Sequence, residues 1–331
     1  MACGSPPALQ DRFGRRITYV RLSLTDRCDM RCRYCMAEQM EFLPRSEILS
    51  LEEIAVLARA FLARGVKRIR LTGGEPLVRR GATALAQEIG QMLGQGLDEL
   101  TLTTNGARLA EHADALWLAG IRRINVSLDT RDEARFRHVT RLGNLADVLD
   151  GLAAAKARGF SIKINMVAMK AINDHEYADM LAWCVDQGFD LSFIETMPLG
   201  EVADDRTDRF IPLTAVRDTL TSAFNLVPSV HRTGGPARYW AVDGAATRVG
   251  FISPLTENFC ASCNRVRVSA SGKLYMCLGH EDHVDLRAAL RGDDPAALDT
   301  VLDAAMGAKP ERHHFDLGTV ATRRHMSVTG G

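Results

Sequence analysis

The chain has 331 residues, of which 46% are hydrophobic and 25% are charged, a composition typical of a globular protein. Its 41 basic and 41 acidic residues give a net charge of zero, which argues against a dedicated nucleic-acid or anionic-membrane surface. No apolar run approaches the roughly 20 residues that span a bilayer, and the first residues lack the apolar core of a signal peptide. We therefore expect a cytoplasmic protein that binds neither nucleic acid nor membrane.

Six apolar, β-rich runs recur along the chain, and each is expected to form a strand: Thr18–Leu24, Arg68–Leu71, Glu99–Thr103, Arg123–Leu128, Ser161–Val167 and Asp190–Ile194. Amphipathic stretches that end on glycine lie between them, and we expect helices over residues 50–65, 82–96, 110–120, 145–159 and 175–188. Ser50 followed by Glu53 predicts a capping box at the start of the first helix. The alternation of strands and helices predicts a parallel α/β sheet or barrel.

The unusual motifs of the chain follow the predicted strands. CDMRCRYC comes after the first strand, TGGEP after the second, TTNG after the third, SLD after the fourth and ETMPLG after the sixth. In (β/α) barrels the active site is built from the loops at the C-terminal ends of the strands. The five motifs are therefore expected to form one site.

The strand–helix pattern ends near Pro198. An acidic, mixed stretch follows, and beyond it two hairpin-like segments, RYWAVDGAATRVGFI and RVRVSASGKLYMC, surround a second group of cysteines. We expect a flexible N-terminus over residues 1–15, a partial (β/α)6 TIM-like barrel over 16–210, and a smaller C-terminal α+β domain over 211–331.

The first cysteine group is Cys28, Cys32 and Cys35, with the spacing C-x3-C-x2-C. Structural zinc is almost always held by four ligands in a closed site. Three thiolates suit a [4Fe–4S] cluster, in which the fourth iron stays open for an exogenous ligand. The spacing favours such a cluster, and a zinc site completed by a distant His or Asp is the alternative.

The second group is Cys260, Cys263 and Cys277, again a set of three. Taken alone it also fits a zinc ribbon, with His280 or His283 as the fourth ligand. A second incomplete triple in the same chain strengthens the cluster interpretation, and the separation of the two sets in the sequence favours two clusters over one shared site. Cys184 and Cys3 lack ligand spacing and are interpreted as structural or incidental.

These motifs carry a family resemblance. The cysteine triple followed by GGEP is similar to the radical S-adenosylmethionine (SAM) superfamily. YVRLSLTDRCDMRCRYCM, IRLTGGEPLVRR, LTTNG, RRINVSLDT, FIETMPLG, FCASCNRVRVSASGKLYMCL and the final GG resemble the GTP 3′,8-cyclase family of molybdenum cofactor biosynthesis. The resemblance covers the chain from about Phe13 to Gly331.

The resemblance implies two [4Fe–4S] clusters, one on each cysteine triple, with SAM bound by the first and the guanine of GTP by the second. In the family the 5′-deoxyadenosyl radical removes the ribose C3′ hydrogen, and the new radical attacks C8 of the same guanine. The positions that match SAM contacts are Tyr34, Gly73, Gly74, Glu75, Thr103, Asn105, Ser127 and Met197. Asn125 and Asp129 flank the last of these strand ends.

The resemblance also implies a set of GTP contacts. The matching positions are Arg21, Arg68, Arg70, Lys163, Arg265, Arg267, Gly330 and Gly331, of which Arg21, Arg265 and Arg267 are the expected catalytic residues. Arginine suits phosphate because its planar fork binds two oxygens. Arg265 and Arg267 alternate on one strand, so both are expected to point to the same face. A solvated surface position is the alternative for each arginine taken singly.

Two positions depart from the family pattern. Ser192 stands where an arginine usually precedes FIE, so one phosphate contact is missing, and Arg68 replaces a lysine found in some relatives. Ser192 keeps open a radical SAM paralogue that acts on another substrate, such as a peptide. A non-enzymatic zinc protein with two structural sites is the alternative from another class.

The expected partners also follow from the resemblance. They are GTP as substrate, a flavodoxin- or ferredoxin-like electron donor, a cyclic pyranopterin monophosphate synthase that receives the product, and a second copy of the chain in a homodimer.

Overall fold

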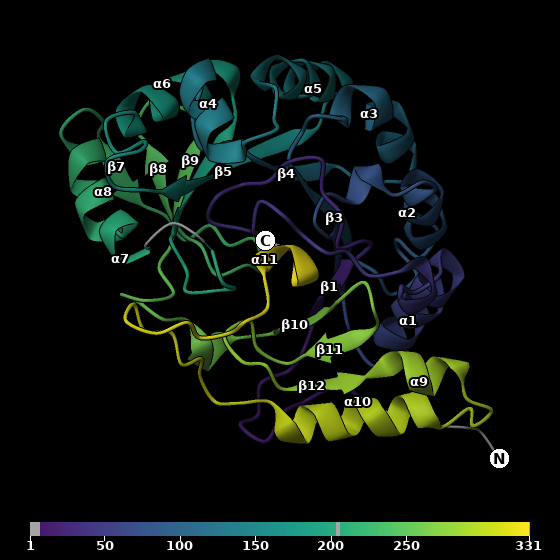
Figure 1. Ribbon diagram of the computed structural model, residues 1–331. Helices are drawn as coiled ribbons and strands as arrows, with labels where there is room; N and C mark the ends of the chain where they lie inside the picture. Colours follow the sequence, from purple (N-terminus) through teal and green to yellow (C-terminus); the bar gives the residue numbers. More distant parts are fainter. Residues whose placement is uncertain (1–6, 203–205, 331) are drawn as a thin grey trace.

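A computed structural model describes residues 7–202 and 206–330 of the chain (Figure 1). Within these residues one sheet of twelve strands has the order β12-β11-β10-β1-β2-β3-β4-β5-β6-β9-β8-β7. Its six central strands are parallel: β1 (Tyr19–Ser23), β2 (Arg68–Thr72), β3 (Glu99–Thr104), β4 (Arg123–Ser127), β5 (Ser161–Ala168) and β6 (Asp190–Glu195). All six coincide with predicted strands, which confirms the partial α/β barrel.

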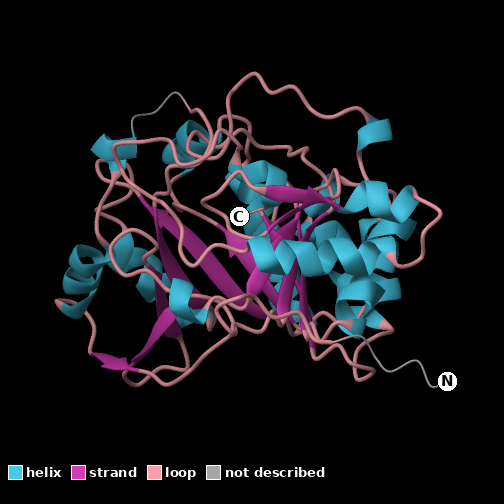
Figure 2. Cartoon of the chain, turned by 90° about the horizontal axis from the view of Figure 1, so that it is seen from below, coloured by secondary structure: helices cyan, strands magenta, loops and turns pink. Residues whose placement is uncertain are grey.

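Helices connect the central strands and lie in an arc outside them (Figure 1). They are α1 (Leu51–Ala63), α2 (Ala82–Gly90), α3 (Leu109–Leu118), α4 (Glu133–Thr140), α5 (Leu145–Arg158) and α6 (Tyr177–Gln187), with the short 3-10 helices Arg45–Glu47 and Pro76–Val78 between them. The apolar residues of the strands pack against this layer, as Val20, Ile69 and Ile124 do. Figure 2, seen from below, shows the strands gathered in the middle of the molecule. No helix in the described part of the chain is long and apolar enough to cross a membrane.

The C-terminal part does not form a sheet of its own. It contributes α7 (Arg206–Arg209), α8 (Leu213–Thr221), β7 (Leu226–Pro228), β8 (Arg238–Val242), β9 (Arg248–Ile252), the 3-10 helix Cys260–Ser262, β10 (Arg265–Val268), β11 (Lys273–Tyr275), β12 (His283–Asp285), α9 (Leu286–Arg291), α10 (Ala297–Ala308) and α11 (Met326–Thr329). β9 pairs in parallel with β6, and β10 pairs in parallel with β1. The expected hairpins are present, but they extend both edges of the barrel sheet, so the boundary at residue 210 stays a prediction.

Local sequence signals account for some of the helix ends. The Ser50 hydroxyl accepts from the Glu53 amide, and the Glu53 side chain accepts from the Ser50 amide, so the predicted capping box is confirmed. The expected helix over 82–96 is wrong beyond Gly90, where α2 ends. At this end the helix lies against the residue that follows α3, since a Cβ at Gly90 would lie 2.0 Å from the Ala119 carbonyl oxygen. Helix α4, which the pattern did not predict, begins at the cap Asp132.

Residues 7–15 differ from the expected flexible N-terminus. Leu9 is buried, and its backbone bonds to Arg64 and Ile17. Asp11 is also buried and pairs with Arg15 at 2.5 Å. Packing of the apolar Leu9 and this internal ion pair hold the segment on the body of the protein. The first six residues of the expected flexible stretch lie outside the described residues.

An ion-pair cluster around the buried side chain of Arg64 connects the N-terminal segment, α1 and α10, and its loss should be measurable. The side chain of Arg64 is 1% exposed, and its guanidinium contacts Asp299 at 2.8 Å, Asp303, and the Pro7 carbonyl at 2.7 Å. We expect Arg64→Met to lower the free energy of unfolding by about 2 kcal/mol, because the carboxylates and the carbonyl lose charged hydrogen bonds.

Chemical denaturation of the apo chain measures this difference. Arg59→Met is the matched control, since Arg59 pairs with Glu88 at 3.0 Å on an exposed surface, and such pairs contribute about 0–1 kcal/mol. Equal losses in the two variants would contradict the assigned role of Arg64.

Candidate active site between two cysteine loops

Polar side chains from neighbouring strands share the interior of the barrel. Register places Arg21 of β1 opposite Arg70 of β2 on one side and Arg267 of β10 on the other. Asn125 of β4 lies opposite Lys163 of β5. Alternate residues of a strand face opposite sides, so these positions point inward while their apolar neighbours pack against the helices. The interior of the barrel is therefore polar and rich in cations.

The first cysteine loop follows β1 and encloses one side of a cavity of about 140 Å³. Cys28, Cys32 and Cys35 all line this cavity. The loop is folded by its own backbone, since the Cys35 amide donates to the Cys32 carbonyl at 2.9 Å. Burial raises the pKa of the Cys35 thiol to about 12 and raises the pKa of Cys28 and Cys32 as well. A positively charged metal centre would offset this burial and hold all three as thiolates.

The donor arrangement suits a cluster. In residues 7–202 and 206–330, no group of three or more His, Cys, Asp or Glu side chains is placed to hold a single metal ion. The three thiols nevertheless surround one cavity, which also contains the ends of β2, β3 and β4. Thiolates around such a space fit an iron–sulfur cluster with SAM beside it.

Gly73 and Gly74 line the same cavity and permit a close backbone approach. The Gly74 amide donates to the Thr25 carbonyl at 2.8 Å. A Cβ at Gly74 would lie 2.4 Å from the Arg27 carbonyl oxygen, and one at Gly73 would lie 2.6 Å from the Thr25 oxygen. Glycine is therefore required where the TGGEP turn lies against the base of the cysteine loop.

Glu75, an expected SAM contact, does not line this cavity. Its carboxylate is fully buried and accepts from the Leu77 amide at 2.9 Å, the Thr104 hydroxyl at 2.9 Å and the Asn105 amide at 2.6 Å. Burial raises its pKa to about 7, while these hydrogen bonds oppose the rise. The structure thus places Glu75 as a support of the TTNG loop.

The remaining expected SAM contacts lie together around the first cavity: Tyr34, Thr103, Asn105, Ser127 and Met197. The Tyr34 hydroxyl donates to Asp129 at 2.8 Å, and Asp129 also accepts from the Val167 amide at 2.8 Å. Burial raises the pKa of Asp129 to about 6. Asp129, which the sequence marked only as a flanking residue, therefore fixes the position of Tyr34.

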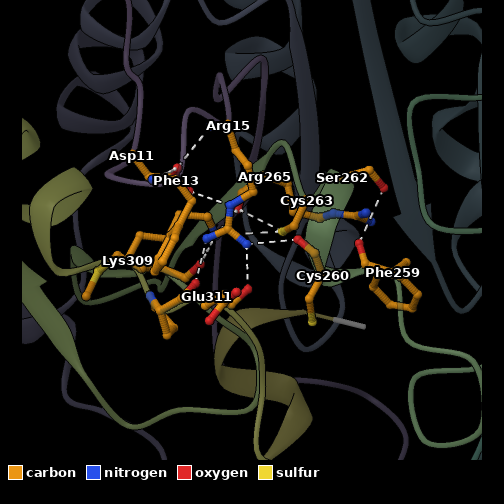
Figure 3. A network of polar contacts seen from close by, with 12 residues as sticks. Asp11, Phe13, Arg15, Phe259, Cys260, Ser262, Cys263, Arg265, Lys309 and Glu311 are labelled. Carbon is orange, nitrogen blue, oxygen red and sulfur yellow. Dashed lines mark hydrogen bonds and ion pairs between the residues drawn. The ribbon is translucent and has the colours of Figure 1, made fainter.

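The second cysteine set lines another cavity, of about 130 Å³. Cys260, Cys263 and Cys277 reach it from the 3-10 helix and from the segment after β11. Arg15 supports this loop by donating to the Cys260 carbonyl at 2.8 Å (Figure 3). Glu195, at the end of β6, accepts from the Leu255 amide at 2.8 Å and so ties the preceding loop to the barrel.

Five cations line the second cavity with these cysteines: Arg21, Arg70, Lys163, Arg265 and Arg267. Burial and the neighbouring Arg265 lower the pKa of Arg267 to about 9, and burial with Arg70 and Arg123 lowers that of Lys163 to about 7. Two nitrogens of Arg21 and the Arg265 Nε atom are buried without hydrogen-bond partners. A cavity with this concentration of cationic side chains and buried unpartnered nitrogens suits a polyanion.

One expected GTP contact, Arg68, lies elsewhere, and so does Ser192, which stands where the family usually has an arginine. Arg68 does not line the second cavity, because its guanidinium points to Glu99, 3.6 Å away, at the other end of the strand. Ser192 is fully buried and also stays out of the lining, beside Gly250. The Tyr239 hydroxyl, which the sequence did not single out, accepts from Lys163 Nζ at 3.2 Å. Tyr239 lies outside the sequence motifs, so no sequence signal could have identified it.

The C-terminal tail enters the barrel. Helix α11 contacts β1, and Met326 and Ser327 line the first cavity. The Gly330 carbonyl accepts from Arg267 at 2.6 Å, so the tail contacts the cation set of the second cavity. Gly330 has a φ of +71°, and Gly331 lies outside the described residues.

The two cavities adjoin each other, because Asn165, Ile194 and Met197 line both. Asn165 has a buried Oδ1 atom without a hydrogen-bond partner. It follows Lys163 by two positions on β5, so strand alternation could have identified it. We call the two adjoining cavities the chamber: the first cysteine triple lines one of them, and the second triple lines the other together with the five cations.

Comparisons with known proteins found matches along most of the chain. Residues 22–184 match the family model "Radical SAM superfamily", and residues 189–315 match "Molybdenum Cofactor Synthesis C". The chain is 59% identical to the GTP 3′,8-cyclase of Erythrobacter litoralis over 98% of both chains. It is 53% identical to that of Rhizobium etli, over 97% of this chain and 94% of the relative.

Among solved structures, SuiB of Streptococcus suis bound to S-adenosylmethionine superposes with a TM-score of 0.63 at 13% identity. The match covers 96% of this chain and 79% of that chain. At this identity the likeness concerns the fold: both chains share the barrel and its C-terminal extension.

Proposed function

The chain belongs to the GTP 3′,8-cyclase family of the radical SAM superfamily, and from this we infer the chemistry of its chamber. It is a radical SAM enzyme that converts GTP to 3′,8-cyclo-7,8-dihydro-GTP, the first step of molybdenum cofactor biosynthesis. The observation that carries this inference is the chamber itself, in which the cavity of the first cysteine triple adjoins a cation-rich cavity that contains the second triple.

The first cavity has the donors for an iron–sulfur cluster and SAM. Cys28, Cys32 and Cys35 would hold the cluster, which leaves one iron open for SAM. When bound, the cluster supplies the electron that cleaves SAM and so provides the 5′-deoxyadenosyl radical for removal of the C3′ hydrogen. The protein positions SAM through Gly73, Gly74 and the cavity-lining ends of β3 and β4. Tyr34 is held toward this cavity by Asp129.

The second [4Fe–4S] cluster is our proposal for Cys260, Cys263 and Cys277. Its support is the repeated open triple and the shared cavity, in which the guanine of GTP would be held at the cysteine end. The five lining cations would bind the triphosphate. The proposed catalytic residues are Arg21, Arg265 and Arg267, which line this cavity and would fix the position of GTP through its triphosphate.

The partners and the location are proposals that follow from this activity. The chain would take electrons from a flavodoxin- or ferredoxin-like protein and pass its product to a cyclic pyranopterin monophosphate synthase. A homodimer is compatible with this function. A cytoplasmic location is supported by the six ligating cysteines, which must stay reduced.

The decisive experiment quantifies two products together. Protein reconstituted anaerobically with iron and sulfide is given GTP, SAM and dithionite, and 5′-deoxyadenosine and the cyclised nucleotide are measured. We expect both products from the wild-type chain and neither from Cys28→Ala, because the cleavage of SAM needs the first triple. 5′-Deoxyadenosine without cyclised nucleotide in the wild type would favour a paralogue with another substrate. Zinc without iron after anaerobic purification would favour the zinc protein.

GTP binding should be coupled to proton uptake through Lys163. Its pKa is lowered from the 10.5 of an exposed lysine to about 7, so the side chain is largely neutral at pH 8 in the free protein. A triphosphate beside it would restore the charged form. We therefore expect GTP binding to take up a proton above pH 7, and affinity to fall as pH rises from about 7.

Calorimetry in two buffers of different ionisation enthalpy at pH 8 measures the proton uptake. Lys163→Met should remove most of the uptake and lower the affinity by roughly 10-fold or more, the effect of one charged hydrogen bond. Lys67→Met, which loses only an exposed contact to the Gly96 carbonyl, is the control. A buffer-independent enthalpy in the wild type would contradict the prediction.

A further inference from the structure

Lys309 is a fully buried cation next to the second cysteine triple. It follows α10 and is 1% exposed. Its ammonium donates to the Met276 carbonyl at 2.5 Å and the Arg265 carbonyl at 3.2 Å, and it lies 3.7 Å from Cys263 Sγ (Figure 3). In the described part of the chain, all three contacts are to carbonyl oxygens and a cysteine sulfur, and none is to a carboxylate.

The contacts of Lys309 join the segments that carry two of the cysteines. Met276 directly precedes Cys277, and Arg265 follows Cys263 by two residues. β10 and β11 pair with each other only at Arg267–Tyr275 and Val268–Leu274. The ammonium therefore bridges the two strands beyond their last paired residues, at the end where the thiols lie.

The segment around Lys309 is itself fixed. Arg15 donates to the Pro310 carbonyl at 2.6 Å, the Glu311 carbonyl at 2.6 Å and the Cys260 carbonyl at 2.8 Å. Asp11 holds Arg15 from the other side at 2.5 Å. Figure 3 shows these residues converging on the cysteine loop from the N-terminal segment and the segment after α10. Arg15 thus holds the backbone that follows Lys309 close to the backbone of Cys260.

The positive charge of Lys309 needs a negative partner in this buried place. Burying an ammonium without a counter-ion is costly, so such a group is normally paired. Three thiolates around a [4Fe–4S] cluster carry net negative charge, and hydrogen bonds to the sulfurs raise the reduction potential of a cluster. We propose that Lys309 is a positioning and electrostatic residue of the second cluster, which aligns Cys263 with Cys277 and raises the reduction potential of the cluster. This inference rests on the second cluster of the proposed function.

The test is a redox titration of the reconstituted full-length chain, followed by electron paramagnetic resonance. The chain with Cys28, Cys32 and Cys35 all replaced by alanine identifies the signal of the second cluster. Lys309→Met removes the charge and the N–H···S contact, and it should shift the midpoint potential of the second cluster to lower values while leaving the first cluster unchanged. Lys309→Arg should restore part of the shift, and Lys67→Met should have no effect.

Four outcomes of these measurements would support or overturn the role of Lys309. An unchanged potential in Lys309→Met, with the full iron content, overturns the role of Lys309 and leaves the second cluster standing. Absence of iron from the triple alanine chain overturns the second cluster and the inference with it. Loss of the second cluster from Lys309→Met but not from Lys309→Arg, at an unchanged melting temperature, supports the positioning role. Loss from both variants at that melting temperature overturns it.

Discussion

Cys260→Ala should separate the two halves of the reaction. We expect 5′-deoxyadenosine to be formed still, because Cys28, Cys32 and Cys35 lie around the other cavity. The cyclised nucleotide should fall by roughly 1000-fold, since the ribose would no longer be held beside SAM, and fixed geometry can supply several kcal/mol of a reaction barrier. The two products are quantified from one reaction mixture by liquid chromatography and mass spectrometry.

Cys184→Ala is the matched control for this variant. Cys184 is also buried, but it lies on α6 among apolar residues outside both triples. Its replacement should leave both products at wild-type amounts. Equal loss of 5′-deoxyadenosine and cyclised nucleotide in Cys260→Ala would show that the second triple is needed for SAM cleavage and would contradict the division of labour.

Gly330→Ala should nearly abolish cyclisation without unfolding the protein. Gly330 has a φ of +71°, and a Cβ there would lie 2.0 Å from the Thr72 hydroxyl oxygen, at the end of β2. The tail would have to move, and the Gly330 carbonyl would leave Arg267, which it now contacts at 2.6 Å. A displacement of about 1 Å can cost roughly 100-fold in rate, so we expect a loss of that size in cyclised product.

Steady-state rates of the cyclised nucleotide measure the effect, with the melting temperature as a check on folding. Gly307→Ala is the control, because a Cβ at Gly307, on α10, would meet no atom within 4 Å apart from its chain neighbours and the backbone of its own helix. A wild-type rate in Gly330→Ala would show that the contact between the tail and Arg267 does not contribute. If the melting temperature of Gly330→Ala falls so far that the protein is unfolded at the assay temperature, the loss of activity would be assigned to lost stability.

Much of the fold was predictable because its signals are local. All six central strands of the parallel barrel were predicted, since apolar, β-branched runs bounded by turns need no long-range information. The capping box of Ser50 and Glu53 was confirmed for the same reason. The close approach of the Ala119 carbonyl to Gly90, where α2 ends, was not predictable, because Ala119 lies in a distant part of the chain.

The candidate site was predictable where a motif or a strand period carried it. The cysteine triples, and Arg265 with Arg267, line the cavities as expected. Arg68 shares the strand face of Arg70 but lies too far along the strand to reach the cavity, so it pairs with Glu99 instead. Glu75 supports backbone groups of the TTNG loop, a role that its motif does not distinguish from ligand contact.

The amino-acid sequence by itself determined the alternation of strands and helices, the two open cysteine triples and the loops that carry them, because each depends on residue type and spacing along a short stretch of chain. Only the tertiary structure decided which cations share a cavity, that the tail reaches Arg267, and that Lys309 lies against Cys263. Lys309 is separated from that cysteine by 46 residues. Contacts of this kind are set by the packing of whole strands and helices, which no local pattern records.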